Sequence, residues 1–394
     1  MDASTIVTKA LEGHADAMKK IEPIPTRRFA YDSISTIAKE GGYFLGITGL
    51  RGIGKTVLLS QLANEHGGIY VSADDRNLRG VELYDIIKAL AVAGHKKIFI
   101  DEIHSKPPWD QDLKTVYDEG LAYVAFSGSS AIQLKTLKAD LSRRVVLEHL
   151  KPASFREWLH IRKGIELPRL SMAKLIKDKA WVARQYGHAH THLGAYYETG
   201  GVLYEAKSQF YKTIVSTIET IAYKDFSAIK NIQPGTVENF FKLLQLISVS
   251  NPMELSYSSI GETLGKDKVW VMRFLAQVEQ TEALKGVYAC GQGGKPYRKE
   301  AKYYLPFPYR ASLCAAAGIK PSVGSLREEF FINHIDCCFN PSSASVRADF
   351  VADGISFEVG GESKSNRQKA DYRVLDGLDT TGNRIPLFAV GLLY

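Results

Sequence analysis

Short apolar runs alternate with longer amphipathic stretches over the first 150 residues of the chain. The apolar runs predict strands at residues 43–48, 68–73, 97–101, 123–127 and 145–150. The stretches between them have helical spacing and predict helices at residues 56–65, 81–93, 110–117 and 131–137. Strands and helices in alternation are typical of a parallel sheet with crossover helices. Residues 1–151 therefore predict an α/β core of the nucleotide-binding type.

The strand pattern stops after residue 151, and segments such as SFREWLHIRKG and KLIKDKAWVARQ have helical spacing instead. This predicts an all-helical domain over residues 152–232 that packs beside the sheet. Gln233, Pro234 and Gly235 break the helical pattern and mark the next domain boundary.

Residues 233–318 have the element order of a winged helix-turn-helix. Three helices are expected at residues 237–249, 258–264 and 268–282, and two strand-like runs, LKGVYAC and AKYYLPF, then flank the turn GQGGKP. The last segment, residues 319–394, predicts a small α+β domain with a helix at residues 327–335 and strands at 345–352, 355–359 and 386–393.

Composition sets limits on the class of protein. The chain has 394 residues, of which 45% are hydrophobic and 24% charged, which excludes disorder and coiled coil. No apolar run reaches the roughly 18 residues of a membrane span, and MDASTIVTKALEG is charged where a signal peptide is apolar, so we expect a soluble cytoplasmic protein. The net charge of +7 is a mild excess that leaves the partner open. The four cysteines form no CxxC pair and are expected to be reduced.

The segment GLRGIGKT fits the phosphate-loop pattern GxxxxGK[ST], with an apolar strand before it and a helix after it. Its glycines allow backbone N–H groups to surround a polyphosphate, and the helix N-terminus adds a positive dipole end. Lys55 is expected to reach the β- and γ-phosphates, and the Thr56 hydroxyl to ligate Mg²⁺. The predicted nucleotide-binding residues are Gly49, Leu50, Arg51, Gly52, Ile53, Gly54, Lys55, Thr56 and Val57.

Acidic and hydroxyl side chains follow the next predicted strands. Asp101 ends an apolar strand and could hold Mg²⁺ with Thr56, while Glu102 could deprotonate the attacking water. Ser127 and Ser129, at the end of the run YVAFSGSS, could sense the γ-phosphate, although a serine-rich turn is commonly only a turn.

Two arginines precede the fifth predicted strand. Arg143 or Arg144 could stabilise charge in the transition state, supplied to a neighbouring subunit. The alternative is a surface pair that binds acidic side chains, and the sequence does not choose between the two arginines.

Four motifs in order, GLRGIGKTVLLSQL, IFIDEIHSKPPWDQDLK, VAFSGSSAIQL and LSRRVVLEHLKPASFREWL, resemble the prokaryotic and archaeal AAA-type ATPases of the ATPase plus DUF4143 architecture. The resemblance implies a P-loop NTPase fold and ATP as the nucleotide. It also implies nucleotide-site roles for Lys55, Thr56, Asp101, Glu102, Ser127, Ser129 and Arg143 or Arg144. This chain departs from the family at His104, where the family usually has glutamine.

The C-terminal segment resembles the family's domain that is similar to PD-(D/E)xK nucleases. The resemblance places Glu328, Asp349 and Glu358 on the acidic positions of that nuclease site. Gly360 replaces its lysine, for which Lys364 is a distant substitute. An inactivated nuclease fold is therefore favoured over an active one.

Basic residues gather around the predicted wing and the helix before it. Backbone contact with double-stranded DNA is expected from Lys268, Arg273, Lys295, Arg298 and Lys299, within a region that also holds Lys285, Lys302 and Arg310. Winged helices also serve as protein-docking modules, so this alternative stays open. His188, His190 and His192 have alternate spacing, but a solvated loop is favoured there over a metal site.

The sequence thus predicts a Mg²⁺-dependent AAA-type ATPase that binds and hydrolyses ATP and couples turnover to DNA through a winged helix. A homo-oligomer could supply the arginine in trans, and no membrane partner is expected. Two alternatives stay open: a nucleotide-gated DNA-binding regulator with little turnover, and an ATP-driven metal-dependent nuclease.

Overall fold

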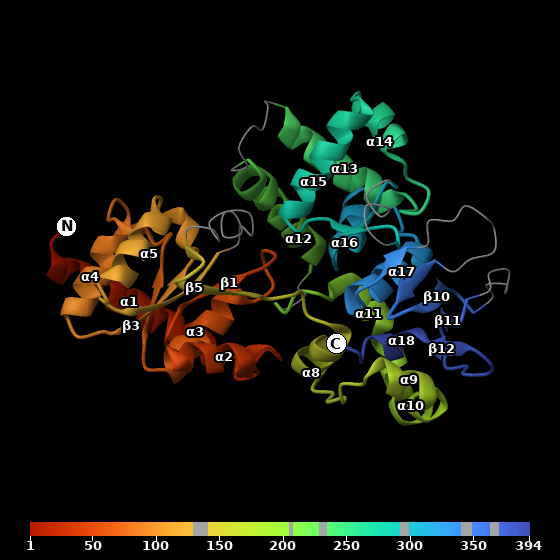
Figure 1. Ribbon diagram of the computed structural model, residues 1–394, viewed down its shortest axis with the longest axis horizontal. Helices are drawn as coiled ribbons and strands as arrows, with labels where there is room; N and C mark the ends of the chain where they lie inside the picture. Colours follow the sequence, from red (N-terminus) through yellow and green to blue (C-terminus); the bar gives the residue numbers. More distant parts are fainter. Residues whose placement is uncertain (129–140, 205–207, 228–234, 292–298, 340–348, 363–369) are drawn as a thin grey trace. The chain divides into compact units, whose positions relative to one another are not determined.

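The computed structural model describes residues 1–394 except 129–140, 205–207, 228–234, 292–298, 340–348 and 363–369 (Figure 1). The chain divides into two compact units, Met1–Lys151 and Pro152–Tyr394, which are described separately below.

Unit 1 is built on a parallel five-stranded sheet in the order β2-β3-β4-β1-β5. Its strands are β1 (Phe44–Thr48), β2 (Ile69–Ser72), β3 (Lys97–Asp101), β4 (Tyr123–Ser127) and β5 (Val145–His149). The order places β4 between β1 and β3, so the carboxyl ends of these three strands meet at one edge. The predicted parallel α/β core is confirmed.

Helices flank this sheet, and two of them were not predicted. The described helices are α1 (Ala3–Ile21), α2 (Tyr31–Glu40), α3 (Lys55–Glu65), α4 (Leu83–Val92) and α5 (Trp109–Asp118), with 3-10 turns η1 (Arg76–Leu78) and η2 (Ile103–Ser105). The Asp2 carboxylate caps α1 by accepting from the Thr5 N–H at 2.8 Å. Ile6 and Ala10 of α1 are buried in the core of the sheet. The helix expected at residues 131–137 lies outside the described residues.

Unit 2 begins with helices. These are α8 (Phe155–Lys163), α9 (Met172–Lys177), α10 (Lys179–Tyr186), the 3-10 helix η3 (Gly187–His192), α11 (Leu193–Thr199), α12 (Phe210–Thr220) and the π-helical turn η4 (Ile221–Phe226). The next group is α13 (Thr236–Val249), α14 (Tyr257–Leu264), α15 (Lys268–Gln280) and the antiparallel pair β6 (Lys285–Val287) and β7 (Lys302–Tyr304). The expected order of three helices and a hairpin is present, while the winged-helix assignment itself stays a prediction.

The C-terminal part of unit 2 holds a mixed sheet in the order β12-β11-β10-β9-β8. Its elements are α16 (Tyr309–Ala316), α17 (Val323–His334), β8 (Cys338–Phe339), β9 (Phe350–Ala352), β10 (Ile355–Gly360), β11 (Tyr372–Leu375), β12 (Arg384–Pro386) and α18 (Leu387–Val390). The strand expected at residues 386–393 is wrong, because all four residues of α18 are buried and a short apolar run has no period that distinguishes strand from helix.

The core of unit 2 combines segments that the sequence assigned to different domains. The Phe155 ring of α8 lies 5.5 Å from Phe330 of α17, and Tyr196 of α11 lies 5.7 Å from the same ring. These contacts belong to one hydrophobic cluster that also includes the C-terminal sheet. Residues 152–199 and 319–394 therefore share a core, and the divisions at residues 232 and 318 stay predictions.

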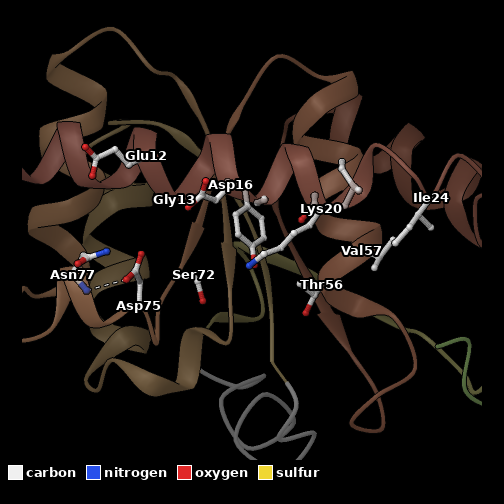
Figure 2. A pocket seen from close by; sticks show the side chains of 14 residues that line it. Glu12, Gly13, Asp16, Lys20, Ile24, Thr56, Val57, Ser72, Asp75 and Asn77 are labelled. Atoms are coloured by element: carbon white, nitrogen blue, oxygen red, sulfur yellow. Dashed lines mark hydrogen bonds between the residues drawn. The ribbon is translucent and has the colours of Figure 1, made fainter. Parts of the chain in front are cut away.

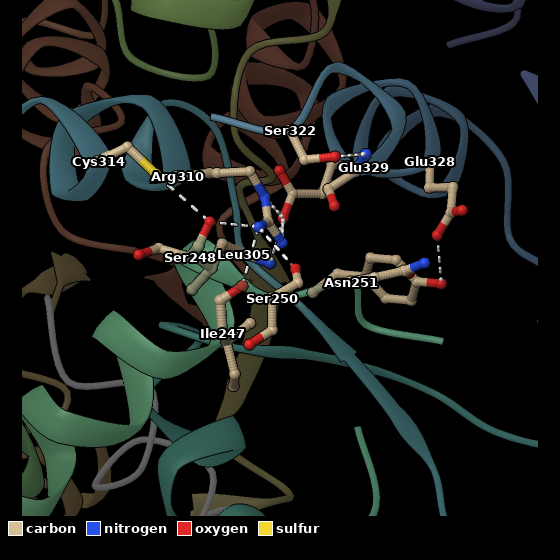
Figure 3. A network of polar contacts seen from close by, with 12 residues as sticks. Ile247, Ser248, Ser250, Asn251, Leu305, Arg310, Cys314, Ser322, Glu328 and Glu329 are labelled. Carbon is tan, nitrogen blue, oxygen red and sulfur yellow. Dashed lines mark hydrogen bonds and ion pairs between the residues drawn. The ribbon is translucent and has the colours of Figure 1, made fainter. Parts of the chain in front are cut away.

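A buried ion pair joins three segments of unit 2 (Figure 3). Arg310 of α16 donates from Nε to Glu329 Oε1 of α17 at 2.9 Å, and both side chains are 1% exposed. Arg310 Nη1 also donates to the carbonyls of Ile247 at 2.8 Å and Ser248 at 2.6 Å at the end of α13. Glu329 further accepts from the Leu305 N–H at 3.0 Å. Arg310 is thus a structural residue and is not available to DNA.

A disulfide joins Cys290 to Cys338, so the expectation of four reduced thiols is wrong. The Cys290 N–H also donates to the Phe339 carbonyl at 2.9 Å, which brings the end of the β6 segment beside β8. Cys314 and Cys337 remain free thiols. The pairing spans 48 residues and depends on tertiary contacts, which residue spacing does not report.

Candidate nucleotide-binding site

The phosphate loop connects β1 to α3 through residues 49–54. Gly49, Gly52 and Gly54 have φ of 145°, 86° and 96°, in the region that favours glycine. A Cβ on Gly49 would lie 2.3 Å from the Leu150 carbonyl oxygen, so this position also has no room for a side chain. Space around Gly54 is open, which leaves the start of α3 accessible to a ligand.

The Lys55 ammonium lies within this loop. Its Nζ donates to the carbonyls of Gly49 and Leu50, each at 2.8 Å, and the residue is buried. These bonds hold a positive charge against the backbone of the loop.

Arg28 supports the phosphate loop by hydrogen bonds to backbone carbonyls, a role that the sequence did not suggest. Its Nη1 donates to the Ile53 carbonyl at 2.6 Å and its Nη2 to the Lys151 carbonyl at 2.8 Å. The side chain is buried although it lies in the segment between α1 and α2. No motif marks this position, because its partners are backbone atoms far away in the sequence.

Asp101 lies at the edge of the sheet beside the phosphate loop. Its carboxylate accepts hydrogen bonds from the hydroxyls of Tyr70, at 3.0 Å, and Ser127. Burial raises the pKa of Asp101, and the hydroxyls of Ser127 and Thr56 partly offset this shift. The structure therefore gathers Thr56, Asp101 and Ser127 as predicted, and it adds Tyr70 of β2.

Glu102 follows in a left-handed conformation, with φ of 51°. Its Oε2 lies 3.4 Å from Arg51 Nη2 and 3.3 Å from His104 Nε2. Burial lowers the pKa of His104, which favours the neutral ring, and its Nδ1 is buried without a hydrogen-bond partner among the described residues. His104 is therefore the Nε2–H tautomer, which donates to Glu102. The residue at which this chain differs from the family thus contacts the predicted base.

The two predicted arginines differ in their surroundings. Arg144 donates from Nε to Asp118 Oδ1 at 2.8 Å and from Nη2 to Oδ2 at 3.0 Å, and this contact raises its pKa. Arg143 is exposed. The second predicted sensor, Ser129, lies outside the described residues.

A cavity of about 550 Å³ opens beside Thr56 between α1, α3 and the end of β2 (Figure 2). Thr56 and Val57 line one end, and Asp75 and Asn77 line the other. The cavity was not predicted from the sequence, because one of its walls is α1, a helix that was not predicted.

The predicted DNA-contacting residues are only partly available in the structure. Lys268 Nζ pairs with Glu300 Oε1 at 2.6 Å, whereas Arg273 and Lys299 are exposed. Lys295 and Arg298 lie outside the described residues. Of the other basic residues in this region, Lys285 donates to the Ile332 carbonyl and Lys302 to the Leu255 carbonyl, so both are bound within unit 2.

The acidic positions of the nuclease-like segment each have a protein partner. Glu328 accepts from the Tyr304 hydroxyl at 3.1 Å, and Asp349 accepts from the Val359 N–H at 3.0 Å. Glu358 is buried on β10 with Arg373 Nε 3.7 Å away. No group of three or more His, Cys, Asp or Glu side chains suited to a metal occurs among the described residues. Lys364 lies outside the described residues.

Of the histidines with alternate spacing, His188 is exposed on η3.

The phosphate-loop region matches a known family. Residues 42–159 match the family model described as the AAA domain. This region is therefore similar to AAA domains. The match ends at residue 159, so the expected DUF4143 domain stays a prediction.

Sequence similarity to other proteins extends beyond residues 42–159. The uncharacterized protein MJ1637 of Methanocaldococcus jannaschii is 29% identical over 386 residues, which cover 87% of this chain and 81% of the relative. The uncharacterized protein MJ1544 of the same organism is 31% identical over 123 residues, or 29% of this chain and 28% of the relative.

Solved structures are similar at lower levels. AMPPCP-bound DnaA from Aquifex aeolicus shares 15% identity at a TM-score of 0.29, covering 64% of this chain and 87% of that chain. The RuvB Holliday junction branch migration motor of Thermotoga maritima shares 15% identity at a TM-score of 0.28, covering 69% of this chain and 88% of that chain. TM-scores this low do not establish a common overall fold.

Within the described residues, no helix combines the length and apolar character that crossing a bilayer requires.

Proposed function

We propose that the AAA domain binds Mg-ATP at the phosphate loop and hydrolyses it. The observation that carries this proposal is the position of Asp101, a buried carboxylate whose described partners are hydroxyl groups, beside Thr56 of the loop. A buried carboxylate with neutral partners retains its attraction for a cation. The surroundings of Asp101 therefore suit a metal-bound phosphate.

The residues present fit both the nucleotide and the metal. Loop N–H groups and Lys55 would hold the β- and γ-phosphates, and Thr56 with Asp101 would hold Mg²⁺. Bound Mg²⁺ withdraws charge from the phosphate oxygens. The open space at Gly54 is the place where a phosphate oxygen can approach the start of α3 without a clash.

Glu102 acts as the base in this proposal. Its carboxylate accepts a proton from the water that attacks the γ-phosphorus as the bond to the β-bridging oxygen breaks, so ADP and phosphate are the products. Arg51 and His104 position that carboxylate. Lys55 stabilises the charge on the leaving oxygens, and Arg143 of a neighbouring copy completes the site, since Arg144 is already bound to Asp118.

Phosphate release from Mg-ATP by the full chain tests the proposal. We expect turnover by the native protein and a loss of at least about a hundredfold in Glu102→Gln, with ATP binding retained. Glu40→Gln is the matched control, since Glu40 is exposed at the end of α2, and it should leave turnover unchanged. Equal turnover by native protein and Glu102→Gln would contradict the role of Glu102.

Coupling to DNA is the second part of the proposal. It is supported by the helix, helix, helix and hairpin order of α13 to β7 and by the exposure of Arg273 and Lys299. Arg273→Glu with Lys299→Glu should weaken binding to double-stranded DNA and flatten its salt dependence, because each lost phosphate contact removes about 0.9 from the logarithmic slope. A control with Lys212→Glu and Lys320→Glu changes the net charge equally at two other exposed positions. If both double variants bind DNA alike, the helix and hairpin are not the interface.

A further inference from the structure

The N-terminal helix forms one wall of the cavity beside the phosphate loop. Its residues Glu12, Asp16 and Lys20 lie along this wall, opposite Thr56 and Ser72 (Figure 2). The cavity is therefore continuous with the side of the phosphate loop that carries the Thr56 hydroxyl.

Helix α1 is fixed to unit 1 by polar and apolar contacts. His14 Nδ1 accepts from the Tyr70 N–H of the edge strand β2 at 3.1 Å, and Lys9 Nζ donates to the Asn77 carbonyl at 3.2 Å. Ile6 and Ala10 are buried against the sheet. These contacts give the side chains that follow on α1 a defined position above the cavity.

Lys20 extends from α1 toward the cavity, which Ser72 and Thr56 line as well (Figure 2). The adjacent Lys19 forms an ion pair with Asp16, with 3.8 Å between Nζ and Oδ1. Lys20 itself has no hydrogen bond or ion pair with any described residue. An ammonium group is thus presented to the cavity without a protein partner.

Charge divides the cavity into two ends. Glu12 and Asp75 line the end away from the phosphate loop, and carboxylates there would repel an anion. Lys20 and Thr56 line the other end, next to the positive end of α3. Asp16 lies on the wall between the two ends, so an anionic group is best held at the Lys20 and Thr56 end.

We propose that Lys20 binds the terminal phosphate of a nucleoside triphosphate seated in the phosphate loop. This inference rests on the proposed function, since it requires ATP at Lys55 and Thr56. The N-terminal helix then makes a contact that ADP cannot make, so Lys20 discriminates between the two nucleotides. A charge-assisted hydrogen bond at this position corresponds to about a tenfold or larger difference in affinity.

Calorimetric titration of ATP and ADP, each with Mg²⁺, tests the inference in full-length protein carrying Glu102→Gln to prevent turnover. Lys20→Met should weaken ATP binding about tenfold or more and leave ADP binding unchanged. Lys20→Arg should retain the preference for ATP, because it keeps the charge. Lys19→Met removes the neighbouring lysine and should change neither affinity.

The outcomes separate the two claims. If the protein with Lys20 intact binds ATP and Lys20→Met keeps the same ratio of ATP to ADP affinity, the role of Lys20 is overturned while ATP binding stands. An equal loss of affinity for ATP and for ADP would also overturn the role of Lys20, because that result indicates a general effect on the site. If the protein with Lys20 intact binds neither nucleotide, the proposed function fails and the inference fails with it.

Discussion

Asp101 of unit 1 and Glu329 of unit 2 are both buried carboxylates whose pKa is raised by burial, yet their partners differ in charge. Asp101 accepts from the neutral hydroxyls of Tyr70 and Ser127. Glu329 is bound to the Arg310 guanidinium. A buried acid with neutral partners can attract a cation from outside, whereas one with a cationic partner holds the fold together.

The same comparison applies to the acidic positions of the nuclease-like segment. Glu358 is a buried acid within strand β10, whereas Asp101 is the last residue of β3, and Arg373 faces Glu358 from the neighbouring strand β11. Both acids are buried on strands, and the structure shows that Glu358 has an internal counter-charge.

The largest expected effect is on the buried pair of unit 2. Arg310→Met leaves the Glu329 carboxylate buried without its cation, and we expect unit 2 to lose about 3–5 kcal/mol of its free energy of unfolding. Urea denaturation followed by circular dichroism measures this change. Lys268→Met breaks a pair between an exposed lysine and the half-buried Glu300 and should cost less than about 1 kcal/mol. Equal effects of the two variants would show that Arg310 is not a structural residue.

A smaller effect is expected at Glu102, the proposed base. His104→Ala removes the group that donates to Glu102, and we expect turnover to fall about tenfold, because the carboxylate becomes free to rotate away from the water. His104→Gln restores a donor of similar reach and should recover part of the loss. Steady-state kinetics distinguish this positioning role, since kcat should change more than KM. Unchanged kcat in His104→Ala would show that Glu102 needs no such support.

The smallest effect concerns the attachment of α1. Burial lowers the pKa of His14, so the folded state prefers the neutral ring that accepts from Tyr70. The stabilisation is therefore present above the unfolded pKa of about 6.5 and is lost as the pH falls through the lower folded value. Hydrogen exchange should show faster opening of α1 at low pH than at neutral pH. His14→Ala should remove most of this pH dependence, and a variant that retained it would assign the effect to another group.

The sequence predicted the elements that are long, periodic or marked by a motif. The strands of unit 1 were predicted to within two residues because each is a short apolar run bounded by polar residues. Helix α1 was missed, since it buries only Ile6 and Ala10 and its other positions are polar or half-buried. The helix α18 was predicted as a strand because its apolar run is too short to show a period.

The candidate site was predicted in part for the same reasons. Lys55, Thr56 and Asp101 lie in motifs whose spacing reflects their chemistry. Arg28, and Tyr70 as a partner of Asp101, act through contacts between distant segments, which no local pattern reports. The same holds for the disulfide between Cys290 and Cys338.

Turnover and stability of Asp101→Asn, measured on the same protein, decide whether this buried carboxylate serves the nucleotide site or the fold. We expect Mg-ATP turnover to fall at least about a hundredfold. We also expect unit 1 to unfold at no lower urea concentration, because hydroxyl groups can donate to or accept from the neutral amide. Native turnover in Asp101→Asn would contradict the claim that this carboxylate serves the nucleotide site. Loss of stability comparable to that of Arg310→Met would show that Asp101 is a structural acid like Glu329.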